Sequence, residues 1–246
     1  MTEQEWLLSN APQKMFSALN PGRLVGCAQP TPRQLRLWAC ALARRPYPDQ
    51  TDPDWLAAMI TAECYADGVL TPYGRPTTDS LKKASRKAEC VWGWLWCSLQ
   101  PEIEHATTET LATLQGFQAT WEDEGASDLL RDVLGNPFRP VELDPRWQTK
   151  DVLAVAEAIY QNYDWQCLGV LLDALQEAGC GNPHILQHLS GSMWCPRCHG
   201  EGQIPTTSGV VMYRKCPKCW GMKNLTHPPH ARGCWVLDLL TGRNNK

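Results

Sequence analysis

The spacing of apolar residues predicts that most of this chain is α-helical. After Thr31, apolar side chains recur at i, i+3, i+4 and i+7, in the series Leu35, Trp38, Ala39 and Leu42. The same period returns in the segment 151–160, with Val152, Val155, Ala156 and Ile159. The sequence has no regular alternation of strand and helix patterns and no internal repeat. We therefore predict a mainly α-helical body over residues 1–190.

Helix start and stop signals support this interpretation. Thr2 and Glu5 have the spacing of a capping box, in which each side chain pairs with a backbone N–H group that lacks a helical partner. Thr31 repeats the device with Gln34. Further helices are predicted over 53–68 (burying Trp55, Met59 and Ile60), 79–99, 108–121, 127–134, 168–178 and 183–189, with a last helix within 233–242 that closes the body.

Composition places the chain among packed globular proteins. Its 246 residues are 43% hydrophobic, which favours a buried core. Twelve cysteines would suit a disulfide scaffold only in a short secreted chain. The first residues, MTEQEWLLSN, are acidic where a signal peptide is basic, and no apolar run reaches the ~18–20 residues of a membrane span. We expect a reduced, cytoplasmic protein without membrane contact, in which the cysteines at 27, 40, 64, 90, 97, 167, 180 and 234 are mostly small buried residues.

Charge is distributed unevenly along the sequence. Residues 1–190 carry 15 basic and 24 acidic side chains, whereas residues 191–232 carry six basic side chains and the single acid Glu201. The predicted body is therefore acidic, and the segment that follows it is basic. Such a basic segment is attractive to phosphate groups.

Four cysteines in this basic segment predict a zinc site. Cys195, Cys198, Cys216 and Cys219 form two C-x2-C pairs, and two intervening residues let one tight turn bring both sulfurs to a metal. Four thiolates leave no open position, so one structural Zn²⁺ per chain is expected. Residues 210–213 are β-prone, which predicts a hairpin that turns near 206–209. An iron–sulfur cluster is the alternative for four cysteines. His199, His227 and His230 lie nearby, and we expect them to be solvated or hydrogen bonded.

The first cysteine pair resembles known zinc motifs. CPRCHGEG, residues 195–202, fits the C-x-x-C-x-G-x-G repeat of the DnaJ-type cysteine-rich domain and is similar to the zinc hairpin of lambdoid phage Q antiterminators. The second pair, CPKCWGMK, departs from the repeat because Lys223 replaces the last glycine. The chain also has two repeats where the DnaJ-type domain has four. Peptide binding or contact with nucleic acid is what these resemblances imply.

The remaining sequence resembles a family of uncharacterised bacterial proteins. The matching stretches are MTEQEWL, RQLRLWACALARR, LLRDVLGNPFRPVELDPRW, LLDALQEAGC, HILQHL and HARGCWVLDLLTG. That family supplies no activity to transfer. Its members have a short connection from HILQHL to RGCW, so the zinc module resembles an insertion between Leu189 and His230. We therefore divide the chain into a helical body, 1–190, and a zinc-binding module, 191–229.

Evidence for an active site is weak in this sequence. The acidic run around Asp123, Asp128 and Asp132 fits a solvated helix start better than a catalytic carboxylate pair. Cys234 follows a basic residue, yet the sequence nominates no general base for it. The motif Asn136-Pro137-Phe138-Arg139 is distinctive. We interpret it as a rigid extended elbow, with Phe138 in the core and Arg139 paired to Asp132 or Asp144.

We predict a non-enzymatic zinc-binding protein with regulatory or adaptor function. The favoured partner is nucleic acid or a nucleic-acid-associated protein, contacted through Arg197, Arg214, Lys215 and Lys218. A protein-interaction module, chaperone-like or scaffolding, is the first alternative, and it would use Trp194 and Trp220. An enzyme with its site near Asn136–Arg139 is the second alternative. No small-molecule substrate is predicted.

Overall fold

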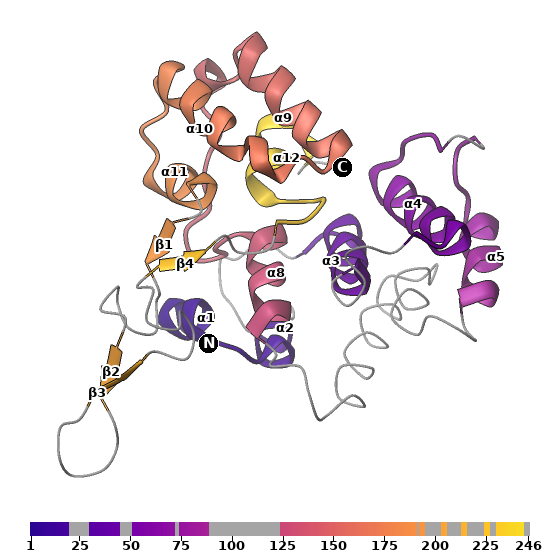
Figure 1. Cartoon of the computed structure of the whole chain (residues 1–246), viewed down its shortest axis with the longest axis horizontal. Coiled ribbons are helices and arrows are strands. Elements are labelled where there is room, and N and C mark those ends of the chain that lie inside the picture. The colour runs from indigo at the N-terminus through magenta and orange to yellow at the C-terminus, as the bar shows by residue number, and fades with distance from the viewer. Residues whose placement is uncertain are drawn as a thin grey trace.

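A computed structural model describes most of the helical body and short parts of the basic segment. The described residues are 1–19, 30–44, 51–71, 74–88, 124–190, 192–194, 203–205, 213–215, 224–226 and 230–243. Within them the protein is mainly helical, as the apolar spacing predicted (Figure 1). The expected helix 108–121 and the second half of the expected helix 79–99 lie outside the described residues.

Five helices lie in the described residues of the N-terminal half: α1 (Glu3–Leu8), α2 (Pro12–Ala18), α3 (Pro32–Arg44), α4 (Pro53–Asp67) and α5 (Thr78–Ala88). Both predicted capping boxes are confirmed. The Thr2 hydroxyl accepts a hydrogen bond from the Glu5 backbone N–H, and the Glu5 carboxylate accepts one from the Thr2 backbone. The same reciprocal pair joins Thr31 and Gln34 at the start of α3.

The second half adds the helices α8 (Glu124–Leu134), α9 (Lys150–Asn162), α10 (Leu168–Glu177), α11 (Pro183–Leu189) and α12 (Trp235–Thr241). Two single 3-10 turns, Pro145–Trp147 and Trp165–Cys167, precede α9 and α10. The last helix, α12, packs against α9 and α8. Figure 1 shows α9 to α12 grouped together above α8 and α3.

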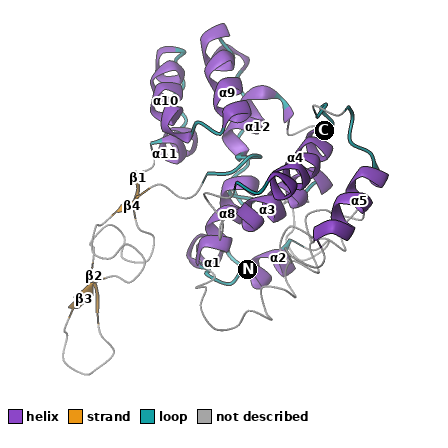
Figure 2. Ribbon diagram, turned by 45° about the vertical axis from the view of Figure 1, so that its right-hand side comes forward, coloured by secondary structure: helices purple, strands orange, loops and turns teal. Residues whose placement is uncertain are grey.

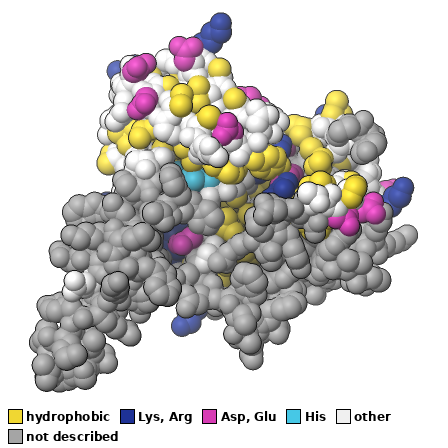
Figure 3. Space-filling model, in the orientation of Figure 1, with side chains coloured by type: hydrophobic (Ala, Val, Ile, Leu, Met, Phe, Trp, Pro, Cys, Tyr) yellow, Lys and Arg dark blue, Asp and Glu magenta, His cyan; other side chains and the backbone are white. Residues whose placement is uncertain are grey.

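In the described part of the chain, three apolar clusters hold the helices together. One joins α9, α10, α11 and α12, with Tyr160 and Leu237 fully buried. A second places Trp6 and Trp38 against α8, where the Trp38 indole N–H donates to the Ala126 carbonyl at 3.2 Å. A third packs α4 on α3 and α5 around Trp55. The described acidic side chains are spread over the visible face of the body instead of forming one patch (Figure 3).

The described parts of the basic segment are four strands of three residues: β1 (Ser192–Trp194), β2 (Gln203–Pro205), β3 (Tyr213–Lys215) and β4 (Asn224–Thr226). They form two antiparallel pairs, β1 with β4 and β2 with β3. In Figures 1 and 2 the β1–β4 pair lies next to α11, and β2–β3 lies farther from the helices. Residues 206–212, where a hairpin turn was predicted, lie outside the described residues.

Three local expectations are wrong. Ile60 is 38% exposed instead of buried, and it is absent from the apolar cluster that contains Trp55, Ala58, Met59 and Ala62 of α4. The helix expected from 127 begins earlier, at Glu124. Residues 136–139 form a turn rather than an extended elbow, since the Asn136 side chain accepts the Phe138 backbone N–H at 3.0 Å and the Arg139 N–H reaches the Asn136 carbonyl.

Among the helices in the described ranges, none combines the length and the apolar character needed to cross a bilayer.

Candidate metal centre

Residues 230–235 connect the basic segment to α12 and contribute side chains to two buried polar clusters. Gly233 makes this possible. Its φ of +91° turns the backbone sharply, and the Cβ of any other residue would lie 2.8 Å from Leu37. Arg232 enters a network of charged side chains on one side of the turn, whereas His230 and Cys234 meet Asp132 and His188 on the other.

The second cluster consists of Asp132 from α8, His188 from α11, and His230 and Cys234 from the turn before α12. One candidate ligand atom from each residue lies within 4.8 Å of all the others. Asp132 Oδ1 is 2.8 Å from His230 Nδ1 and 3.2 Å from His188 Nε2. His188 Nε2 is also 3.1 Å from Cys234 Sγ. These four side chains could hold a metal ion.

Asp132 is ionised despite its burial. The residue is 1% exposed, and burial alone would raise the pKa of its carboxyl group. Hydrogen bonds from His188 and His230 outweigh that effect and hold the pKa at about 2. Its second oxygen accepts the Ala231 backbone N–H at 2.8 Å. The prediction that this carboxylate belongs to a solvated helix start is wrong, because Asp132 lies on the face of α8 that packs into the body.

His188 and the Cys234 thiol are neutral at neutral pH. Burial lowers the pKa of His188, in spite of the neighbouring Asp132. We therefore attribute the ionisation of Asp132 to hydrogen bonding more than to the charge of an imidazolium. Burial, together with Asp132, raises the pKa of the Cys234 thiol well above its ordinary value. The indole N–H of Trp235 donates to His188 Nδ1 at 3.3 Å, so the His188 proton resides on Nε2.

This geometry is unfavourable for a nucleophilic cysteine. A Cys–His–Asp relay needs the thiol and the carboxylate on opposite nitrogens of the imidazole. Here Cys234 and Asp132 both contact Nε2 of His188. Cys234 is also fully buried, so a substrate has no access to its sulfur. The arrangement suits the binding of a metal ion better than covalent catalysis.

The charged network on the other side of Gly233 is structural. Asp67, at the end of α4, binds Arg33 Nε at 2.9 Å and Arg232 Nε at 2.8 Å. It also accepts the Tyr160 hydroxyl at 2.9 Å. Arg33 also pairs with Asp238 on α12, because its Nη2 donates a hydrogen bond to Asp238 Oδ1 at 2.9 Å. The guanidinium groups of Arg33 and Arg232 therefore both have a carboxylate partner, and the network ties α3, α4, α9 and α12 together.

Most of the zinc and partner-contact residues predicted from the sequence lie outside the described residues. This applies to Cys195, Cys198, Cys216, Cys219, Arg197, Lys218 and Trp220. Trp194 ends β1, and Arg214 and Lys215 end β3. The predicted zinc site and its contacts therefore stay predictions, whereas the position of His230 is established as hydrogen bonded to Asp132.

The Asn136–Arg139 motif connects α8 to the N-terminus. Asn136 Nδ2 donates to Glu3 Oε1 at 2.8 Å, and Arg139 Nε lies 2.6 Å from the same oxygen. The expected pairing of Arg139 with Asp132 or Asp144 is wrong. Asp132 is hydrogen bonded to His188 and His230 instead, and Asp144 pairs with Arg146. Phe138 packs at the edge of the second apolar cluster, and Pro137 completes the turn. These contacts give the motif a role in joining α1 to α8.

Sequence reasoning missed Asp132 and His188 as functional residues, although each had a signal. His188 lies three positions after Ile185 and directly before Leu189, and these three residues form the buried side of α11. Asp132 follows Leu129 by three positions on α8 and is flanked by the buried Val133. A polar residue on an apolar helix face indicates burial, and hence a partner.

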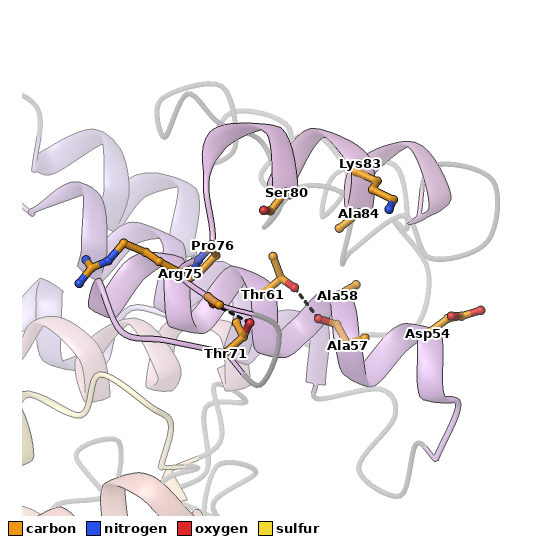
Figure 4. Close-up of a pocket in the computed structure, with 11 residues that line it drawn as sticks. Asp54, Ala57, Ala58, Thr61, Thr71, Arg75, Pro76, Ser80, Lys83 and Ala84 are labelled. Atoms are coloured by element: carbon orange, nitrogen blue, oxygen red, sulfur yellow. Dashed lines mark hydrogen bonds between the residues drawn. The ribbon is translucent and has the colours of Figure 1, made fainter.

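A pocket of about 330 Å³ lies between α4 and α5 (Figure 4). Its walls carry Ala57, Ala58 and Thr61 from α4, and Ser80 and Ala84 from α5. The Arg75 guanidinium points away and donates to the Gly68 carbonyl. The pocket lacks a converging set of acid, base or nucleophile among its described walls, so the buried Asp132 cluster is the better candidate site.

Comparison of the chain with protein-family models, with curated proteins and with solved structures gives no match. The chemistry of the site therefore has to be argued from its own residues.

Proposed function

We propose that this chain is a non-enzymatic zinc-binding protein that contacts nucleic acid through the basic module 191–229. The helical body supports the module. The observation that carries the proposal is the pairing of the four strands. The β1–β4 pair ends at Trp194 and Asn224, and the β2–β3 pair begins at Gln203 and Lys215.

This pairing brackets both cysteine pairs between the same two strand pairs. Residues 195–202 follow β1 and precede β2, and residues 216–223 follow β3 and precede β4. An antiparallel stem that continued from one strand pair to the other would bring the two C-x2-C segments opposite each other. That arrangement favours four thiolates around one tetrahedral Zn²⁺, with sulfurs about 2.3 Å from the metal. Such a site is closed and supplies rigidity instead of chemistry.

A rigid zinc site would hold basic side chains in fixed positions. Arg214 and Lys215 occupy the end of β3, directly before Cys216. Arg197 and Lys218 lie inside the two C-x2-C segments. Clustered cations release counterions when they meet phosphates, and this release provides most of the sequence-independent affinity for nucleic acid. The acidic body would repel a duplex, so contact is confined to the module.

The test is fluorescence anisotropy of the zinc-loaded protein with short labelled single- and double-stranded DNA and RNA, at low and physiological salt. The double variant Lys215→Glu/Lys218→Glu is compared with Lys82→Glu/Lys83→Glu, which makes the same charge change on the exposed side of α5. We expect binding that the first variant loses and the second keeps. Each lost phosphate contact should also reduce the salt slope by about one.

Absence of binding at low salt by metal-loaded protein would refute contact with nucleic acid. The module would then be a protein-interaction device, and Trp194 and Trp220 would be its natural anchors.

A further inference from the structure

Asp132 is a buried carboxylate that has no permanent cation beside it in the described part of the chain. Within the described part of the chain its hydrogen bonds come from two imidazoles and one backbone N–H, and none comes from a lysine or arginine. The neighbouring Arg232 is committed to Asp67. Buried carboxylates are otherwise paired with a cation or bound to a metal.

A second unsatisfied group lies in the same cluster. The side chain of His230 is 2% exposed, and its Nε2 has no hydrogen-bond partner among the described residues. If Nδ1, the nitrogen next to Asp132, binds a cation, then Nε2 carries the ring proton. The buried carboxylate and the four converging ligand atoms together favour a positive ion at the centre of the cluster.

We propose that Asp132, His188, His230 and Cys234 bind a divalent late first-row metal ion, Zn²⁺ in the first place, separate from the zinc predicted in the module. One carboxylate, one thiolate and two imidazoles form a mixed O, S and N set that suits Zn²⁺. The charges also balance, because a divalent cation offsets the carboxylate and the thiolate and leaves a neutral buried centre. Binding releases the Cys234 proton to solvent.

Binding of the metal requires rearrangement of the four ligand side chains. Tetrahedral bonds of about 2.0–2.1 Å to N and O and 2.3 Å to S separate ligand atoms by about 3.3–3.6 Å. The contacts of Asp132 Oδ1 and His188 Nε2 are now 2.8–3.2 Å. These three contacts would open by several tenths of an ångström, and the ligand atoms that lie farther apart, up to 4.8 Å, would close toward the same spacing. The His188 proton must move from Nε2 to Nδ1, which turns the Trp235 N–H from a partner into a competing donor.

The position of the centre gives it a role. His188 lies in the last turn of α11, immediately before the module, and His230 immediately follows the module. A metal bound by both residues would fasten the two ends of the module to α8. The site is therefore a clamp between the body and the inserted segment.

The test counts metal ions in the purified full-length chain and in three variants. Cys195→Ser/Cys216→Ser removes ligands of the predicted module zinc, and His230→Gln/Cys234→Ser removes ligands of the clamp. Cys180→Ser, a buried cysteine outside both sites, is the matched control. We expect two zinc ions per chain in the wild type and in the control, and one in each double variant.

Cobalt uptake and Trp235→Phe keep the proposal testable if the clamp variant does not fold. We expect Co²⁺ added to the metal-free module variant to give tetrahedral absorption bands with one thiolate ligand. Trp235→Phe removes the competing donor and should tighten Co²⁺ binding by about tenfold. A module variant that holds no zinc and takes up no Co²⁺ would overturn the clamp. A chain whose single zinc survives in the module variant would support the clamp and contradict the zinc in the module.

Discussion

Replacing Asp67 by asparagine should destabilise the protein strongly. The Asp67 side chain is 2% exposed and joins Arg33, Arg232 and Tyr160. The variant keeps the size of the side chain and removes its charge. Arg33 retains Asp238, but Arg232 loses the one carboxylate to which it is hydrogen bonded in the described part of the chain.

The expected cost follows from the burial of this network. Removing one partner of a buried ion pair typically costs about 3–5 kcal/mol, because the remaining charge stays desolvated. Asparagine keeps one acceptor oxygen, so we expect a loss of about 3 kcal/mol. Domains are stable by about 5–15 kcal/mol, and the variant should therefore still fold.

Urea unfolding followed by circular dichroism measures this loss. With a slope of about 2–3 kcal/mol per M, the midpoint should fall by about 1–1.5 M. Asp54→Asn is the matched control, because Asp54 lies exposed in the first turn of the same helix. Its cost should stay below about 1 kcal/mol. If Asp67→Asn were no more harmful than Asp54→Asn, the network would not tie the helices together as argued.

Three further outcomes are expected. Gly233→Ala combines a φ of +91° with a Cβ 2.8 Å from Leu37, so it should cost about 2–4 kcal/mol in the same urea assay; a neutral effect would contradict the sharp turn. Hydrogen bonds from Asn136, and to a smaller extent from Arg139, lower the pKa of Glu3, so Arg139→Met should raise the pKa of Glu3 in a carboxyl NMR titration. Because the pKa of Glu3 is depressed in the folded state, the ionised carboxylate stabilises the protein above the ordinary pKa of a glutamate, and this stabilisation is lost as pH falls. The Arg139→Met variant should therefore lose less stability on acidification than the wild type. Burial raises the pKa of Cys234, so native protein at neutral pH should resist iodoacetamide at this thiol until unfolded, and rapid native labelling would refute its burial.

Local signals explain why the helices could be predicted. The capping boxes at Thr2 and Thr31 use residues three positions apart, and Gly68 ends α4 because its φ of +66° suits glycine. The partners in these contacts lie within about one helical turn of each other in the sequence, so a local pattern is enough to predict them. The predicted burial of Ile60 was wrong because the apolar spacing of α4 is compatible with more than one buried face. Packing against α3 and α5 decides which face of α4 is covered.

The candidate site depended on tertiary contacts that the sequence does not display. Asp132, His188 and His230 come from segments up to 98 residues apart. Counting acids around Asp132 suggested a solvated helix start, but the side of α8 on which each acid lies matters more than their number. Cys234 was noticed because of its neighbours, yet its hydrogen-bond partner His188 lies 46 residues away. Helix periodicity applied to polar residues would have indicated that both Asp132 and His188 are buried.

The salt dependence of nucleic-acid binding, compared between zinc-loaded and chelator-stripped protein, tests the central claim most directly. Contacts by Arg197, Arg214, Lys215 and Lys218 predict a slope of log K against log salt of about −3 on single strands. Removing zinc should abolish that binding, because the cations lose their fixed positions. Binding by zinc-loaded protein that ignores salt, or no binding at all at low salt, would contradict the account.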